Sequence, residues 1–216
     1  MKGKVKKIIV AAIFLISVSF TFSGLSWAGG TIMDEWGSVK PPKAPELKSV
    51  SVDPKTTAFL VLDMQTNNCN NKRRPRCVES IPKIQSFLEK ARAKGMPVVH
   101  SITSSKTKKH IREEVFPKDD EPYVKASVNK FYKTDLGDIL KEKGVKTVII
   151  VGTSAHGAVL HTAVGAAMRK LKIIVPVDGM SASEAFAEQA VAWFLVKGPG
   201  TRKLTTLTKF DLIEIK

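Results

Sequence analysis

Cysteine and histidine are scarce in this chain, which has two cysteines and four histidines among its 216 residues. A zinc site or an iron–sulfur cluster needs several such side chains at close spacing. The sequence contains no such cluster, and no aspartate is followed two residues later by a histidine. We therefore expect no metal site and no cofactor.

Acidic residues are also few, with 20 Asp and Glu against 35 Lys and Arg, and the formal net charge is +15. A field of this sign attracts anionic small molecules and polyanionic surfaces. The lysines are scattered along the chain and are not interleaved with aromatic residues, which make up 7% of it. This distribution disfavours nucleic-acid binding and favours a solvated basic surface with a small-molecule ligand. The 43% hydrophobic content is sufficient for a folded core.

A long apolar run occurs near the N-terminus, from Ile8 to Phe20. It follows four lysines and precedes the sequence Ser26-Trp27-Ala28, whose small residues suit a signal peptidase. We interpret residues 1–28 as a secretory signal peptide. The alternative is an uncleaved membrane anchor, which the Ser and Gly residues that follow the run disfavour. Cleavage would lower the net charge to about +11 and leave a periplasmic or secreted protein without a stable membrane anchor.

The two cysteines, Cys69 and Cys77, lie eight positions apart in a polar stretch. In an oxidising compartment such a pair can form a disulfide that closes a small loop. Alternatively, Cys69 is a nucleophile close to Asp63, a role that a disulfide would prevent. The stretch also contains four basic residues that either meet a substrate carboxylate or are simply solvated: Lys72, Arg73, Arg74 and Arg76.

Apolar runs and helical stretches alternate along the chain. The pattern predicts strands over 58–63, 97–103, 147–151 and 173–177, with a short last strand within 203–215. It predicts helices over 80–94, 135–143, 158–170 and 183–195. Such alternation is typical of a Rossmann-like, three-layer α/β/α domain with a mostly parallel sheet of about six strands. We assign this domain to residues 56–216 and interpret residues 29–55 as an extended N-terminal arm anchored by Trp36.

Three separated segments carry chemically informative residues. The segment TAFLVLDMQ (57–65) is a strand that ends at Asp63, and the segment KASVNKFYKTDL (125–136) contains two lysines, Lys125 and Lys130. The segment KTVIIVGTSAHGAVLHTA (146–163) combines a buried strand, a turn and a helix that begins with small residues. In this order and spacing the three segments resemble those of the isochorismatase-like cysteine hydrolases.

This resemblance implies roles for three residues. Asp63 matches the catalytic acid or base, Lys125 matches the catalytic lysine better than Lys130 does, and Ala158 stands where the family has its nucleophilic cysteine. An alanine cannot attack a carbonyl, so the acyl-enzyme route is excluded at that position. Isochorismatases proper instead cleave a vinyl ether to give pyruvate, with the aspartate as proton donor. By resemblance, Asp63 and Lys125 therefore suffice for such a reaction.

Further substrate contacts are expected beyond the carboxyl ends of the strands, where ligands of parallel sheets bind. The candidate side chains are those of Gln65, Phe131 and His156. The candidate backbone N–H groups are those of Gly157 and Val159, at the start of a helix. His156 can relay protons and Phe131 can pack on a planar substrate. Alternatively, His156 is a turn histidine that bonds to the backbone, and Phe131 belongs to the core. The Asp–Lys pair could also be purely structural.

Two hypotheses on function follow. The first is an exported isochorismatase-family hydrolase of a small, anionic or amide-like molecule that works through Asp63 and Lys125 without a cysteine. The second is a catalytically inactive family member that acts as a small-molecule-binding or assembly protein, with interaction through the arm as a further variant. The small-residue helix 157–167 and the apolar helix with Trp193 and Phe194 also suggest a homo-oligomer, although such surfaces are more often interior.

Overall fold

The computed structural model describes residues 30–216, so the predicted signal peptide lies outside the described residues. The chain divides into two compact units, and the boundary in the sequence falls between Pro42 and Lys43. In the first unit, the short helix α1 (Ile32–Glu35) is capped by Thr31. Residues 43–55, which we expected in the arm, belong to the second unit. Trp36 is 73% exposed, and its anchoring role stays a prediction.

The second unit is built on a seven-stranded sheet in which every strand pairing is parallel. Six strands follow the order β4-β3-β2-β5-β6-β8, and β7 pairs with the end of β5. The fold class predicted from the alternating pattern is confirmed, with short strands β4 and β7 added. The strands are β2 (Thr57–Leu62), β3 (Val98–Ile102), β4 (Tyr123–Lys125), β5 (Thr147–Thr153), β6 (Lys172–Pro176), β7 (Met180–Ser181) and β8 (Thr205–Thr208).

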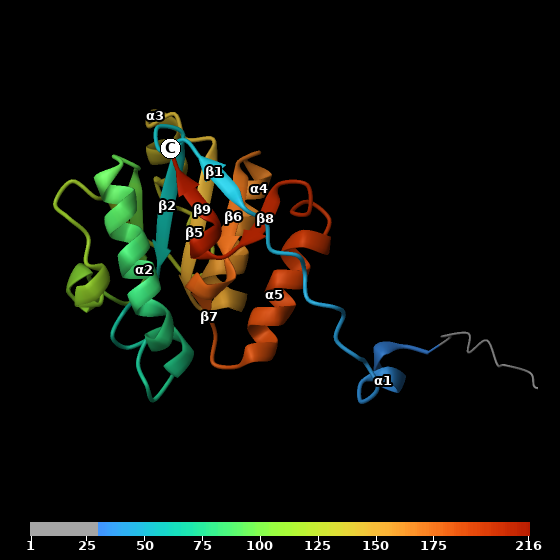
Figure 1. The fold of residues 1–216 in the computed structure, drawn as a ribbon. Helices are drawn as coiled ribbons and strands as arrows, with labels where there is room; N and C mark the ends of the chain where they lie inside the picture. The colour runs from blue at the N-terminus through green and yellow to red at the C-terminus, as the bar shows by residue number, and fades with distance from the viewer. Residues whose placement is uncertain (1–29) are drawn as a thin grey trace, which may run out of the picture. The chain divides into compact units, whose positions relative to one another are not determined.

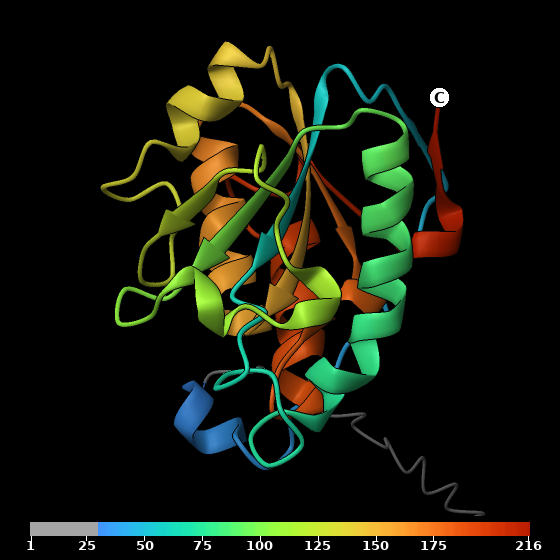
Figure 2. The same cartoon turned by 90° about the vertical axis from the view of Figure 1, so that its left-hand side faces the viewer.

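Helices cover both faces of this sheet (Figures 1 and 2). Helix α2 (Pro75–Ala93) packs on one face, and α3 (Leu136–Glu142), α4 (Leu160–Met168) and α5 (Ala185–Lys197) pack on the other. Helix α2 was predicted to begin at Ser80, but it begins at Pro75, because a proline fits the first turn of a helix. A π-helical turn, Ala155–Val159, precedes α4 and replaces the predicted helix start at Ala158. Short 3₁₀ turns occupy Lys108–His110, Glu113–Val115, Val177–Gly179 and Phe210–Leu212.

Two hydrophobic clusters form the core, one on each face of the sheet. Every residue of β2 is buried, as expected for a strand covered by helices on both sides. On the α2 face, Phe87 packs edge-on against Phe59 with ring centroids 5.0 Å apart, and it also contacts Phe210 at 5.1 Å. The core therefore fixes the central strands, whose carboxyl ends carry the candidate site.

The direction of chain winding reverses between β2 and β5. From β2 the chain proceeds to β3 and β4 on one side, whereas β5 is followed by β6 and β8 on the other. Gly152 in β5 has φ +116°, and a Cβ at this position would lie 2.0 Å from the carbonyl oxygen of Leu62, so only glycine fits. In such sheets the crevice at the reversal point binds ligands.

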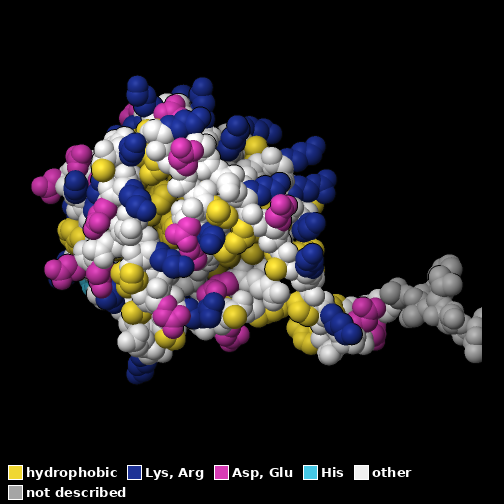
Figure 3. All heavy atoms as spheres, in the orientation of Figure 1, with side chains coloured by type: hydrophobic (Ala, Val, Ile, Leu, Met, Phe, Trp, Pro, Cys, Tyr) yellow, Lys and Arg dark blue, Asp and Glu magenta, His cyan; other side chains and the backbone are white. Residues whose placement is uncertain are grey.

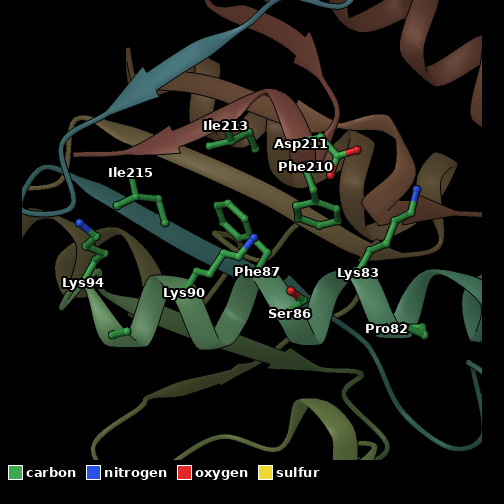
Figure 4. Close-up of a pocket in the computed structure, with 11 residues that line it drawn as sticks. Pro82, Lys83, Ser86, Phe87, Lys90, Lys94, Phe210, Asp211, Ile213 and Ile215 are labelled. Carbon is green, nitrogen blue, oxygen red and sulfur yellow. The ribbon is translucent and has the colours of Figure 1, made fainter.

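The predicted last strand within 203–215 forms two strands in different sheets. Besides β8, residues Ile213–Ile215 form β9, which pairs in parallel with β1 (Val50–Val52). A groove of about 440 Å³ lies between α2 and this C-terminal segment, lined by Phe87 and Lys90 of α2 and by Phe210 (Figure 4). None of the predicted site residues lines this groove.

Charged side chains of both signs are mixed over the visible face of the second unit (Figure 3). Lys and Arg are the more frequent, as the composition requires. Within residues 30–216, no helix combines the length and apolar character needed to cross a membrane.

A buried ion-pair network joins α2 to the edge of the sheet. Arg92 donates two hydrogen bonds to the carboxylate of Glu121, both 2.7 Å long, and His100 lies 3.1 Å from the same carboxylate. Burial acts to raise the pKa of Glu121, but hydrogen bonds from Arg92 and His100 outweigh it and hold this pKa well below its ordinary value. Burial lowers the pKa of His100, so the imidazole is neutral at pH 7.

We predict that Glu121→Gln destabilises the protein by about 1–2 kcal/mol at pH 7, because charged hydrogen bonds to Arg92 are lost. A group whose pKa is lower in the folded state stabilises the folded protein at pH values above its unfolded-state pKa, and this stabilisation disappears as the pH falls. The difference between the variant and the wild type should therefore shrink below about pH 4. Urea unfolding between pH 7 and about pH 4 measures this difference in stability, and Asp120→Asn at an exposed position is the control. An equal stability of both variants at pH 7 would contradict a stabilising network.

Candidate functional site

Asp63 lies directly after β2, at the reversal point of the sheet. It has φ +51°, a left-handed conformation that aspartate tolerates better than most residues. Its backbone N–H donates to the carbonyl oxygen of Ser101 (3.2 Å), and the Ser101 hydroxyl donates to its Oδ1 (2.8 Å). The side chain is thus held by the neighbouring strand β3 and is 4% exposed.

The partner of Asp63 is Lys130. The ammonium of Lys130 lies 2.8 Å from Asp63 Oδ2, and it also donates to the carbonyl oxygens of Ala126 and Ser127. An ammonium has three N–H donors, so all of them are used. The side chain of Lys130 is fully buried, and the pair is enclosed by protein.

Helix α4 positions the segment that carries Lys130. The backbone N–H of Lys130 donates to the hydroxyl of Thr162, which in turn donates to the carbonyl oxygen of Val128. A Cβ at Gly165 would lie 2.7 Å from Asn129 Oδ1, so this glycine allows the segment to approach the helix closely. The small residue Gly165 in this helix therefore helps to position Lys130.

The structure corrects the pairing predicted for Lys125. This residue ends the edge strand β4, opposite Ile102 of β3, and its side chain is exposed. The burial pattern of β4 alternates, so Val124 points into the core and Lys125 points away from it. The lysine that contacts Asp63 is Lys130, five residues later.

The buried pair changes the acidity of both groups. Burial raises the pKa of Asp63 above its ordinary value, and the ion pair with Lys130 and the hydrogen bond from Ser101 only partly oppose this shift. Burial likewise lowers the pKa of Lys130, against the attraction of Asp63. A carboxyl group with a raised pKa keeps its proton at higher pH and is suited to donate it.

The turn after β5 contains Ala158, which is 3% exposed within the π-helical turn. The N–H groups of Gly157 and Val159 both donate to the carbonyl oxygen of Ser154, so two groups predicted to bind a substrate oxygen already have an acceptor. A Cβ at Gly157 would lie 2.6 Å from the hydroxyl of Ser154. His156, two residues before Ala158, is exposed.

Phe131 is packed in the core. Its ring is 4% exposed, lies next to Gly165 of α4 and is covered by the guanidinium of Arg169, 4.4 Å from the ring centroid. The cation–π contact and the burial account for this aromatic side chain. The structure therefore favours the core role of Phe131 over the predicted contact with a planar substrate.

The predicted disulfide between Cys69 and Cys77 is confirmed, with an S–S distance of 2.06 Å and both residues fully buried. These are the two cysteines of the sequence, so no thiol remains free. The alternative in which Cys69 acts as a nucleophile is wrong, because a disulfide sulfur is not a thiolate. Within residues 30–216, no group of three or more His, Cys, Asp or Glu side chains is arranged to hold a metal ion.

Gln65 is fully buried below the loop that the disulfide closes. Its Oε1 accepts hydrogen bonds from the backbone N–H of Thr103 (3.0 Å) and from the side chain of Asn68 (3.4 Å). Ser101 was not among the site residues predicted from the sequence. Its position at the carboxyl end of a strand that neighbours β2 is a signal that could have identified it.

The chain is similar in sequence to known proteins. The sequence profile of the Isochorismatase domain matches residues 57–207. A protein of Verticillium dahliae named secreted isochorismatase effector Isc1 is 32% identical over 136 residues, which cover 57% of this chain and 72% of that protein.

Solved structures share the fold. A cysteine hydrolase from Pseudomonas syringae pv. phaseolicola is 20% identical, with a TM-score of 0.67 over 77% of this chain and 94% of that chain. An isochorismatase-like hydrolase from Alkaliphilus metalliredigens is 26% identical, with a TM-score of 0.65 over 72% of this chain and 95% of that chain. Since the profile covers more than half of the sequence and the fold agrees, the chain belongs to the isochorismatase domain family.

Proposed function

We propose that the protein is an exported hydrolase that cleaves the vinyl ether of a small anionic substrate by proton transfer from Asp63. The observation that carries this proposal is the buried pair of Asp63 and Lys130 in a chain without a free thiol. A thiolate route has no nucleophile here, whereas a carboxyl group with a raised pKa can supply a proton.

In the proposed reaction, Asp63 transfers its proton to the terminal carbon of the vinyl ether, and the adjacent carbon becomes an oxocarbenium ion. A water molecule adds to that carbon and returns a proton to Asp63. The resulting hemiketal breaks its bond to the leaving alcohol and gives pyruvate. Lys130 acts next to Asp63, where its ammonium stabilises the carboxylate that remains after proton transfer.

Isochorismate is the first substrate to test, because the relative from Verticillium dahliae carries isochorismatase in its name. That relative is also named as secreted, which supports the proposed export together with the lysines and apolar run at the N-terminus. The disulfide is typical of oxidising compartments. The intact mass of the secreted protein tests this part: a chain that still contains residues 1–28 would contradict cleavage.

The assay for the proposed function is release of pyruvate from isochorismate, coupled to lactate dehydrogenase. We expect turnover by the wild type that persists after treatment with iodoacetamide, because no thiol is available for alkylation. Binding of isochorismate without release of pyruvate would instead favour the inactive binding or assembly protein.

We also propose that the protein is a homo-oligomer. On α5, Phe186 and Trp193 lie two helical turns apart on one side and are 73% and 42% exposed. Large exposed apolar side chains that share a face are typical of contact surfaces. Light scattering after size-exclusion chromatography tests this, and a monomeric mass at micromolar concentration would contradict it.

A further inference from the structure

Arg74 lies at the start of α2, on the loop closed by the disulfide. Its Nη1 donates to the carbonyl oxygen of Asn68 (3.2 Å), whereas its Nε is buried and has no hydrogen-bond partner. Within residues 30–216, Arg74 forms no ion pair, unlike its neighbour Arg76, which binds Glu188. A guanidinium partly withdrawn from water with a donor to spare is unfavourable unless an anion arrives to accept that hydrogen bond.

A second unused donor belongs to the same cluster. Gln65 is fully buried, and its Oε1 has two donors, but its Nε2 has no partner. Asn68 links the two residues, because its side chain donates to Gln65 and its carbonyl oxygen accepts from Arg74. Gln65 and Arg74 are thus joined through Asn68, and each has a spare N–H donor of the kind that a carboxylate oxygen accepts.

The cluster is joined to the proposed proton donor, because the backbone N–H of Gln65 donates to the carbonyl oxygen of Asp63 (2.8 Å). The charges of Arg74 and Asp63 influence each other. Burial and the charge of Arg73 lower the pKa of Arg74, and Asp63 partly opposes this shift. Burial raises the pKa of Asp63, and Arg74 is among the groups that oppose this shift. Lys130, the other cation next to Asp63, has already used its three donors. Arg74 is therefore the cation that can bind a substrate anion here.

We propose that Arg74, supported by Gln65, binds the carboxylate of the vinyl-ether group and makes the site specific for carboxylated substrates. This inference rests on the proposed function. In an enolpyruvyl group, the carboxylate is attached to the carbon next to the one that accepts the proton. A carboxylate receptor beside Asp63 thus places the terminal carbon near the acid, which raises the rate through positioning.

The test is binding of isochorismate, measured by titration calorimetry, to protein in which Asp63→Asn prevents turnover. In this background we expect Arg74→Gln to weaken binding roughly 10- to 100-fold, the cost of a lost charged hydrogen bond. Arg73→Gln is the matched control, because Arg73 is exposed on the same loop, and it should change binding less than about threefold. Arg74→Lys, which keeps the charge but loses the planar fork, should fall between them.

Kinetics with Asp63 intact give a second measure. Arg74→Gln should raise KM by a similar factor with a smaller effect on kcat. Pyruvate should inhibit the wild type more strongly than methyl pyruvate does, and this difference should be absent in the Arg74→Gln variant. Equal isochorismate affinities of the Arg74→Gln and Arg73→Gln variants, with native circular dichroism, would overturn the inference. So would the absence of any isochorismate binding. If the wild type binds isochorismate in an Arg74-dependent way but releases no pyruvate, the proposed hydrolysis fails and the carboxylate receptor stands.

Discussion

Replacement of Lys130 by methionine is expected to lower the rate of pyruvate release by roughly 100- to 1000-fold, the typical cost of removing one preorganised electrostatic group. The reason is the position of the Lys130 ammonium, 2.8 Å from Asp63 Oδ2 in a fully buried setting. When Asp63 gives up its proton, a carboxylate forms where water cannot solvate it. The ammonium is the charge that stabilises this carboxylate, so its loss raises the barrier for proton transfer.

The matched control for this prediction is Lys125→Met. Lys125 carries the same charge five residues earlier, but its side chain is exposed on the edge strand β4. Its removal should leave turnover within about twofold of the wild type, because an exposed charge is screened by solvent and salt. Kinetics of both variants at a fixed ionic strength measure the contrast. A larger loss for Lys125→Met than for Lys130→Met would restore the lysine assignment made from the sequence.

Replacement of Asp63 by asparagine should reduce turnover roughly 100- to 10,000-fold, the range that a positioned acid contributes. An amide has nearly the same shape as the carboxyl group but no proton to donate at neutral pH. Loss of the carboxylate leaves the fully buried Lys130 ammonium without its counter-charge, so we expect Asp63→Asn to destabilise the protein by about 3–5 kcal/mol, and turnover is compared at a temperature where circular dichroism shows the variant folded. Exposed Asp119→Asn is the control for loss of a negative charge.

The pH dependence has a definite sign. Since burial raises the pKa of Asp63, the protonated acid persists above the ordinary range for aspartate, and kcat/KM of the wild type should fall as the pH rises through this pKa. A raised folded-state pKa also means that the contribution of Asp63 to stability is present at low pH and is lost as the pH rises. Turnover by Asp63→Asn at the wild-type rate would exclude Asp63 as the proton donor.

The sequence predicts the scaffold well because the scaffold depends on local patterns. The buried strand that ends at Asp63 and the apolar run before the turn at Ala158 are visible as periodicity, and parallel strands bring their carboxyl ends to one edge. The disulfide between Cys69 and Cys77 follows from their spacing and from the proposed oxidising compartment. These features need no knowledge of distant contacts.

The choice between the two lysines depends on tertiary contacts. Lys125 and Lys130 occur in one polar segment. Lys130 is held inward by the hydrogen bond from its backbone N–H to Thr162, more than 30 residues later, and by the close approach of its neighbours in the chain to Gly165. Such packing has no local sequence signal. Pairing of β1 with β9 is equally non-local, because it joins residues near the two ends of the domain, so the arm was predicted too long.

Hydrolysis of isochorismate in D₂O tests whether Asp63 donates a proton to the substrate. Proton transfer from Asp63 to the terminal vinyl carbon converts a CH₂ group into a methyl group, so in D₂O each pyruvate should carry one deuterium on that methyl carbon. Immediate reduction to lactate prevents exchange before mass spectrometry. We expect monodeuterated lactate from the wild type and little product from Asp63→Asn. Product without deuterium, or equal amounts of deuterated product from both proteins, would contradict proton donation by Asp63.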